Sequence, residues 1–197
     1  MIGEHDMKTS SKLNLFLCAA LVSMMTAGVP GCALEQEDVE IEQDMTPEDT
    51  LAPKAWTGWT ADDLAPVTCP AGRIARGADC DGSACEYLRL DCVPVSGLVL
   101  GESSWSDWFS EEGSAYRKCA ADEWLTGIAC DGGDCDNISL QCTQSLNASA
   151  NAGTWSAYYS EEDSYYRAPT GRYLRGVRCT GGDCDNMSYL HSSIHWD

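Results

Sequence analysis

The side chains best suited to bind a cation lie in two short acidic turns of this 197-residue chain. Their carboxylate and amide oxygens come from Asp131, Asp134, Asp136 and Asn137 in one turn and from Asp183, Asp185 and Asn186 in the other. Oxygen ligands of this kind could gather a hard cation such as calcium. Asp and Asn also hydrogen-bond to their own backbone in tight turns, and this is the role that we favour. We expect no other cofactor.

Pairs of aromatic residues three positions apart are the second candidates for ligand contact. They are Trp105 with Trp108 and Trp155 with Tyr158. Aromatic faces stack on sugar rings, so an exposed ring flanked by Ser, Asp and Glu would suit a glycan. On a strand, residues i and i+3 point to opposite faces, which would leave one ring of a pair exposed. For either ring we favour core packing, because large aromatics usually fill the space between sheets.

The chain has little that indicates catalysis. Adjacent carboxylates occur in Ser110-Glu111-Glu112 and Ser160-Glu161-Glu162. Glycoside hydrolysis needs two carboxyl groups that converge across a cleft, so we interpret these pairs as solvated loops. The histidines lie at position 5 and near the end of the chain, and no Gly-x-Ser-x-Gly motif is present. We therefore expect a protein that is not an enzyme.

Short strands joined by tight turns must position these residues. Apolar and polar residues alternate in Tyr87–Cys92, Asn137–Cys142 and Asn186–His191, as in half-buried strands. The intervening Asp-Gly-Gly-Asp and Thr-Gly-Gly-Asp sequences favour turns. No window shows a sustained helical period. The sequence therefore predicts an all-β fold.

These elements recur from Trp56 onward with a period of about 50 residues, which is typical of stacked or symmetric units. We predict one domain at 54–197 with repeats at 54–97, 98–147 and 148–197. Each repeat would contribute three or four short antiparallel strands.

The cysteines recur with the same period. Full sets are Cys69, Cys80, Cys85, Cys92 and Cys119, Cys130, Cys135, Cys142, whereas the third repeat keeps Cys179 and Cys184 but has Ala168 and His191 at the outer positions. An exported domain avoids unpaired thiols, so the joint loss of the outer two indicates that they are partners. We predict outer disulfides Cys69–Cys92 and Cys119–Cys142 and inner disulfides Cys80–Cys85, Cys130–Cys135 and Cys179–Cys184. Structural zinc is the alternative that we favour less.

The first 53 residues predict export. A short basic region precedes the apolar run Leu13–Gly28, which is shorter than the roughly 20 residues of a membrane span, so we interpret 1–31 as a lipoprotein-type signal peptide. Val29, Gly31 and Cys32 resemble a bacterial lipobox and predict lipidation of Cys32; an ordinary signal with an incidental cysteine is the alternative. Residues 33–53 carry eight acidic residues, no basic residue and no aromatic residue, so we predict a disordered tether at 32–53. The expected location is the outer membrane or cell surface, or else the medium.

The charge of the chain excludes several partners. Its formal net charge is −19 and its pI is about 4.2. Nucleic acid binding needs basic surface to neutralise phosphates, and anionic lipid surfaces would repel the chain. We expect no nucleic acid partner, and membrane association only through a lipid anchor.

The repeats resemble those of the vitelline membrane outer layer protein I family. The resemblance is carried by Trp105, Trp108, Ser110, Cys119, Gly127, Asp136, Asn137, Leu140 and Cys142, with Trp155, Tyr158, Asp185 and Asn186 in the next copy. It implies a disulfide-stapled antiparallel β-prism, with three Greek-key sheets around a pseudo-threefold axis and one sheet per repeat. It also implies an extracellular coat role with carbohydrate binding. The Cys-x4-Cys-Asp-Asn turn is similar instead to repeats of uncharacterised secreted proteins.

These observations together predict a non-catalytic binding module at the cell surface, directed at an extracellular glycan or surface polymer. Its contacts would be the acidic turns and any exposed ring of the aromatic pairs. The alternatives are a purely structural coat protein and a secreted hydrolase.

Overall fold

The computed structural model describes residues 55–113 and 115–197. The predicted signal peptide, the predicted lipidation of Cys32 and the predicted tether lie outside the described residues and stay predictions. In the part of the chain that is described, the helices are three-residue 3-10 turns, and none could span a membrane.

The described residues are organised as short strands and tight turns, as the alternating pattern predicts. The elements are β1 (Ala55–Trp56), β2 (Val67–Thr68), β3 (Arg73–Asp81), η1 (Ser83–Cys85), β4 (Tyr87–Pro94), β5 (Leu100–Trp105), β6 (Tyr116–Lys118), β7 (Glu123–Asp131), η2 (Gly133–Cys135), β8 (Asn137–Ser145), β9 (Ala148–Ala150), β10 (Thr154–Trp155), β11 (Tyr166–Arg167), β12 (Arg172–Thr180), η3 (Gly182–Cys184) and β13 (Asn186–Trp196). The predicted all-β class is confirmed.

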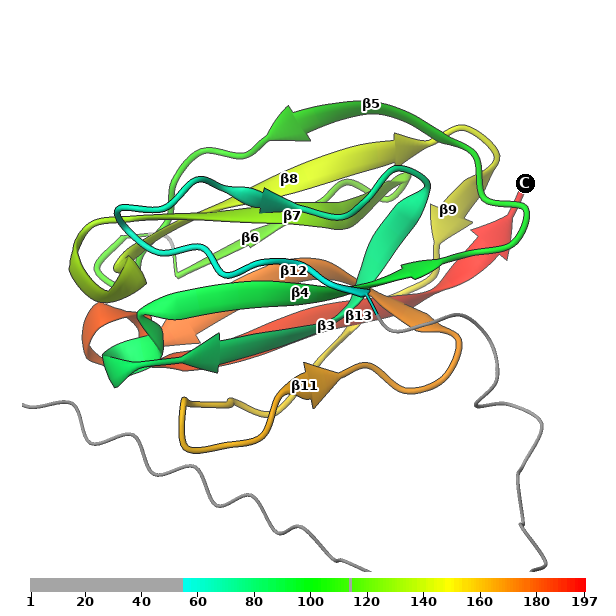
Figure 1. Cartoon of the computed structure of the whole chain (residues 1–197). Coiled ribbons are helices and arrows are strands. Elements are labelled where there is room, and N and C mark those ends of the chain that lie inside the picture. Colours follow the sequence, from blue (N-terminus) through cyan, green and yellow to red (C-terminus); the bar gives the residue numbers. More distant parts are fainter. Residues whose placement is uncertain (1–54, 114) are drawn as a thin grey trace, which may run out of the picture. The chain divides into compact units, whose positions relative to one another are not determined.

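Three antiparallel sheets contain these strands (Figure 1). Sheet 1 has the order β1-β4-β3-β11, sheet 2 the order β2-β7-β8-β5 and sheet 3 the order β10-β13-β12-β6, with β9 paired to the end of β13. Within each sheet, the first strand of a repeat lies beside its last strand, which is the Greek-key order. The predicted arrangement of three Greek-key sheets is therefore present.

One expectation about the sheets is wrong in detail, because no sheet is made by a single repeat. Strand β2 of the first repeat joins sheet 2, β6 of the second joins sheet 3, and β11 of the third returns to sheet 1. Each repeat thus gives one edge strand to the next, and the third closes the cycle. This exchange leaves each sheet dependent on a neighbouring repeat for its edge.

The inner faces of the three sheets share one core. Equivalent inward residues are Leu90, Leu140 and Tyr189, all 2% exposed or less. In the third repeat the aromatic ring of Tyr166 stacks on Tyr189 at 5.2 Å and lies 6.1 Å from His191. Aromatic packing therefore fills the region where the other repeats have an outer disulfide.

All five predicted disulfides are present. The two outer bonds each join cysteines 23 residues apart, and the three inner bonds each join cysteines 5 residues apart. Each inner bond closes the turn between the two long strands of its repeat. The turns η1, η2 and η3 therefore meet at one end of the sheets, at the left of Figure 1, where they contact one another.

Candidate functional site

The predicted acidic turns use several of their oxygens to build their own structure. The carboxylate of Asp131 accepts a hydrogen bond from the backbone N–H of Gly132 at 3.0 Å. The Oδ2 atom of Asp136 accepts one from the Asn137 amide at 3.3 Å. Asp185 and Asn186 repeat the second arrangement at 3.0 Å, whereas Asp134 and Asp183 have the positive φ that the turn requires. These contacts support the turn-building role, and calcium binding stays a prediction.

The structure brings the Ser-Glu-Glu loops to these turns, which sequence reasoning missed. Carboxylate oxygens of Glu111, Glu112 and Asp136 lie within 4.8 Å of one another, and Glu111 accepts the backbone N–H of Asp183 at 2.7 Å. Glu111 is half-buried, so its interpretation as part of a solvated loop is wrong. Burial, with Glu112 and Glu111 nearby, raises the pKa of Asp136.

In the third repeat, Asp185 has the equivalent neighbours Glu161 and Glu162. Burial and a hydrogen bond with Glu161 raise the pKa of Asp185. Two carboxyl groups that meet in this way favour a shared proton over two full charges. The carboxyl groups lie in packed turns and not on facing walls of a cleft, so the cluster does not resemble the paired acids of a glycosidase.

The predicted aromatic contacts lie on outer faces. Trp105 and Trp108 are 42% and 46% exposed, so the core packing that we favoured for them is wrong. The reason is that β5 ends at Trp105 and the chain leaves the sheet before Trp108. Phe109 takes the core position instead, bridged to Ile138. The alternation of side chains along a strand therefore does not apply between Trp105 and Trp108.

Trp155 and Tyr158 also lie outside the core, but they have a partner. The guanidinium of Arg178 lies 4.8 Å from the centre of each ring. Trp155 is half-buried beside Tyr116, at 6.1 Å and nearly perpendicular to it. Of these residues, Trp155, Tyr116 and Arg178 form one wall of a pocket.

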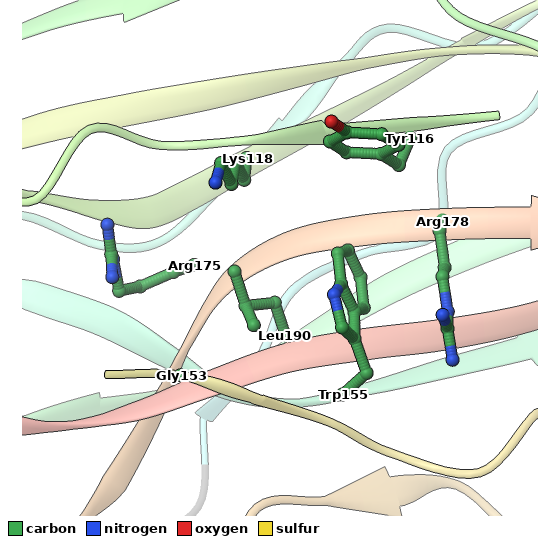
Figure 2. A pocket seen from close by; sticks show the side chains of 7 residues that line it. All are labelled: Tyr116, Lys118, Gly153, Trp155, Arg175, Arg178 and Leu190. Atoms are coloured by element: carbon green, nitrogen blue, oxygen red, sulfur yellow. The ribbon is translucent and has the colours of Figure 1, made fainter. Parts of the chain in front are cut away.

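The pocket lies on the outer face of sheet 3 and has a volume of about 470 Å³. Figure 2 shows its lining, which consists of Tyr116, Lys118, Gly153, Trp155, Arg175, Arg178 and Leu190. The register of the sheet explains why these residues converge. One row across its four strands consists of Trp155, Leu190, Gly176 and Lys118, which lie side by side. Gly176 has no side chain to fill the row, and a Cβ there would lie 2.7 Å from the carbonyl oxygen of Arg117. The donated strand β6 can therefore approach closely and bring Lys118 to the pocket.

Three cationic side chains surround the pocket. Arg175 is only 8% exposed and donates hydrogen bonds to the carbonyl oxygens of Cys119 and Ala120, which hold its guanidinium in place. Lys118 is exposed, and the Nε atom of Arg178 is buried with no hydrogen-bond partner in the described residues. None of these three cations forms an ion pair with a carboxylate of residues 55–113 or 115–197.

The acids closest to Arg175 are engaged elsewhere. Burial lowers the pKa of Arg175, whereas Glu123 and Asp122 oppose that shift. The Glu123 carboxylate accepts the backbone N–H of Ala120 at 2.9 Å, and Asp122 accepts the Gln144 amide at 3.0 Å. These two carboxylates offset part of the Arg175 charge without pairing with it, whereas Lys118 and Arg178 have no carboxylate partner in the described residues.

The arrangement can hold an anionic or polar ligand against aromatic faces. The lining has no carboxylate and no imidazole, and its ionisable side chains are Tyr116, Lys118, Arg175 and Arg178. Sequence reasoning named Trp155 and Tyr158 but missed the three cations, which come from two repeats. An alignment of the repeats could have indicated Arg178 and Leu190, which stand where the first repeat has Asp79 and Asp91, but not the approach of Lys118 to Arg175.

Comparisons of the chain with protein-family models, with curated proteins and with solved structures gave no match.

Proposed function

We propose that the protein is a non-catalytic, extracellular binding module that takes a carbohydrate in the pocket of sheet 3. The observation that carries this proposal is the half-buried Trp155 ring beside an open pocket of about 470 Å³. Small-ligand sites have volumes in this range, with aromatic walls and a few placed polar groups. The Trp155 ring offers a stacking face, and Lys118 and Arg178 offer N–H donors to sugar oxygens.

The setting of the molecule fits this role. Five disulfides indicate an oxidising compartment, such as the outside of a cell. We include in the proposal that Cys32 bears a lipid and that residues 32–53 hold the domain away from the membrane. The domain would then meet glycans or surface polymers at the cell surface.

The test is a glycan array probed with the full chain. We expect binding to a defined subset of glycans and a loss of about tenfold or more in affinity for Trp155→Ala. The matched control is Trp105→Ala, which removes the equivalent ring from sheet 2, where the neighbouring cations are absent from the register row. This control should bind like the wild type.

Two results would contradict the proposal. An array with no bound glycan, from a folded protein, would favour the structural coat role. Equal losses from the two tryptophan variants would show that binding does not occur at the pocket of sheet 3.

A further inference from the structure

The outer face of sheet 1 has the same construction as the pocket on sheet 3. Its row across four strands is Trp56, Asp91, Gly77 and Arg167, and the row on sheet 3 is Trp155, Leu190, Gly176 and Lys118. The first tryptophan lies 5.4 Å from Tyr165, and the second lies 6.1 Å from Tyr116, both nearly perpendicular. Sheet 1 therefore shows the equivalent region with side chains of the protein itself in the place of a ligand.

On sheet 1 the chain supplies its own anions. The fully buried carboxylate of Asp91 accepts a hydrogen bond from Nε of Arg167 at 2.8 Å, forms an ion pair with the same guanidinium at 2.6 Å and lies 3.9 Å from Arg76. A second carboxylate, Asp79, pairs with Arg89 at 2.6 Å. Each arginine on this face thus has an internal carboxylate partner.

Sheet 3 keeps two of these cations and lacks both carboxylates. Lys118 and Arg175 stand at the positions of Arg167 and Arg76, whereas Leu190 replaces Asp91. The position of Asp79 is taken by a further cation, Arg178. A face with three cations and two carboxylates has become a face with three cations and none.

Resting on the proposed function, we propose that the pocket of sheet 3 selects saccharides that bear an anionic group, a carboxylate or a sulfate ester. This group lies over the Leu190 side chain, which stands where sheet 1 has Asp91, beside Lys118 and Arg175, while the sugar ring lies against Trp155 (Figure 2). Arg175 is held by backbone carbonyl oxygens and adds positive charge from its buried position in the pocket lining. At physiological ionic strength, charges more than about 8 Å away are largely screened, so these cations outweigh the acidity of the rest of the chain.

The experiment is isothermal titration calorimetry on the full chain with three hexasaccharides. One contains glucuronate, one contains sulfate esters and no carboxylate, and one is neutral N-acetylglucosamine. We expect at least one acidic probe to bind about tenfold or more tightly than the neutral one, and the two acidic probes separate a carboxylate ligand from a sulfate ligand.

The decisive variant is Leu190→Asp, which rebuilds the internal carboxylate of sheet 1. It should lose about tenfold or more of the affinity for the acidic probe, because its own carboxylate occupies the cations. The melting temperature should not fall, since Asp91 is accommodated at the equivalent position. The matched control is Gln141→Asp, which adds the same charge at the equivalent position of sheet 2 and should bind normally. If Leu190→Asp fails to fold, Lys118→Gln at an exposed position gives the same test, with the same loss expected.

The outcomes separate the two proposals. Equal affinity for neutral and acidic probes, unaffected by Leu190→Asp, would overturn the anion inference and leave the carbohydrate function intact. Binding of inorganic sulfate or of a polyglutamate peptide, lost in Leu190→Asp, with no saccharide bound, would retain the anion site and overturn the carbohydrate function. No binding of any of these probes would overturn both.

Discussion

Asp91 is the residue that most clearly distinguishes the outer faces of the sheets. It is fully buried, and its Oδ2 atom accepts a hydrogen bond from Nε of Arg167 of another repeat and forms an ion pair with that guanidinium. Its equivalents are Gln141 in sheet 2 and Leu190 in sheet 3. This position thus contributes a carboxylate to the outer face of sheet 1, an amide to that of sheet 2 and an apolar side chain to that of sheet 3.

The ion pair between Arg167 and Asp91 predicts a large effect on stability. Removing one partner of a buried pair leaves an uncompensated charge, which typically costs about 3–5 kcal/mol. We expect Arg167→Met to lower the free energy of unfolding by roughly 3 kcal/mol, somewhat relieved by Arg76 at 3.9 Å. Urea denaturation at neutral pH measures this difference.

The control for that prediction is Lys118→Met, the equivalent change on sheet 3. Lys118 has no carboxylate partner in the described residues, so its loss should change the free energy of unfolding by less than about 0.5 kcal/mol. The double variant Arg167→Met with Asp91→Leu should recover most of the lost stability, because no buried charge remains. A loss from Lys118→Met as large as that from Arg167→Met would contradict the explanation.

The contacts of single residues could be predicted from the sequence where two positions of one repeat had changed together. The joint replacement of two cysteines by Ala168 and His191 disclosed the outer disulfides, because an orphan thiol is disfavoured. The cations of the pocket could not be found in this way, because Lys118 and Arg175 come together through the register of a donated strand. The exposure of Trp108 was missed because the strand ends at Trp105.

At the scale of elements, the acidic loops and the disulfide-closed turns act as one unit. Glu111 follows the bridge at Phe109 and accepts the N–H of Asp183 in turn η3 of the next repeat. The loop therefore connects two turns. Sequence spacing did not predict this contact, because the loop and the turn are 72 residues apart.

This unit predicts that stability depends on pH. The pKa values of Asp136 and Asp185 are raised, mainly by burial and then by neighbouring carboxylates, so the folded state holds these protons more tightly than the unfolded chain. Such groups contribute stability that is fully present below the unfolded pKa of about 3.9 and is lost as the pH rises through the folded pKa. In Asp136→Asn with Asp185→Asn this loss is absent. The difference in melting temperature, double variant minus wild type, should therefore increase as the pH rises from about 4 to 7.

A difference in melting temperature that does not change with pH would contradict this account. Calcium gives a separate readout of the same unit. If the oxygens only build turns and share protons, millimolar calcium and chelator leave the melting temperature unchanged at neutral pH. A rise with calcium that is lost in the double variant would show that the acidic turns bind the cation.

At the scale of the whole domain, the repeats predicted three sheets but not the exchange of strands between them. The long strands are periodic, and each bears a cysteine except β13, which has His191 at that position, so they could be assigned to a repeat from the sequence. The donated strands β2, β6 and β11 have only two or three residues and no alternating pattern. Their pairing is decided by the closure of the sheets, which is a property of the assembled domain.

The pseudo-threefold symmetry predicts that a third outer disulfide can be introduced at the positions of Ala168 and His191. The backbone N–H groups of Cys69, Cys119 and Ala168 donate to equivalent carbonyl oxygens at 2.7, 2.7 and 2.9 Å. His191 pairs with Leu174 in the register in which Cys92 pairs with Ala75 and Cys142 with Leu125. The Cα atoms of both native outer disulfides are 5.5 Å apart, so the new pair should reach a similar separation.

We therefore expect Ala168→Cys with His191→Cys to form the bond and to raise the free energy of unfolding by about 3 kcal/mol, because a loop of this length constrains the unfolded chain. Loss of the ring contact between Tyr166 and His191 offsets a small part of this gain in the free energy of unfolding. Non-reducing peptide mapping identifies the bond, and urea denaturation of each single cysteine variant isolates that lost contact. Two free thiols in the folded double variant would show that the third repeat departs from the symmetry of the other two. In that case the aromatic packing of Tyr166 on Tyr189 would have moved the donated strand β11 away from the position that β2 and β6 occupy.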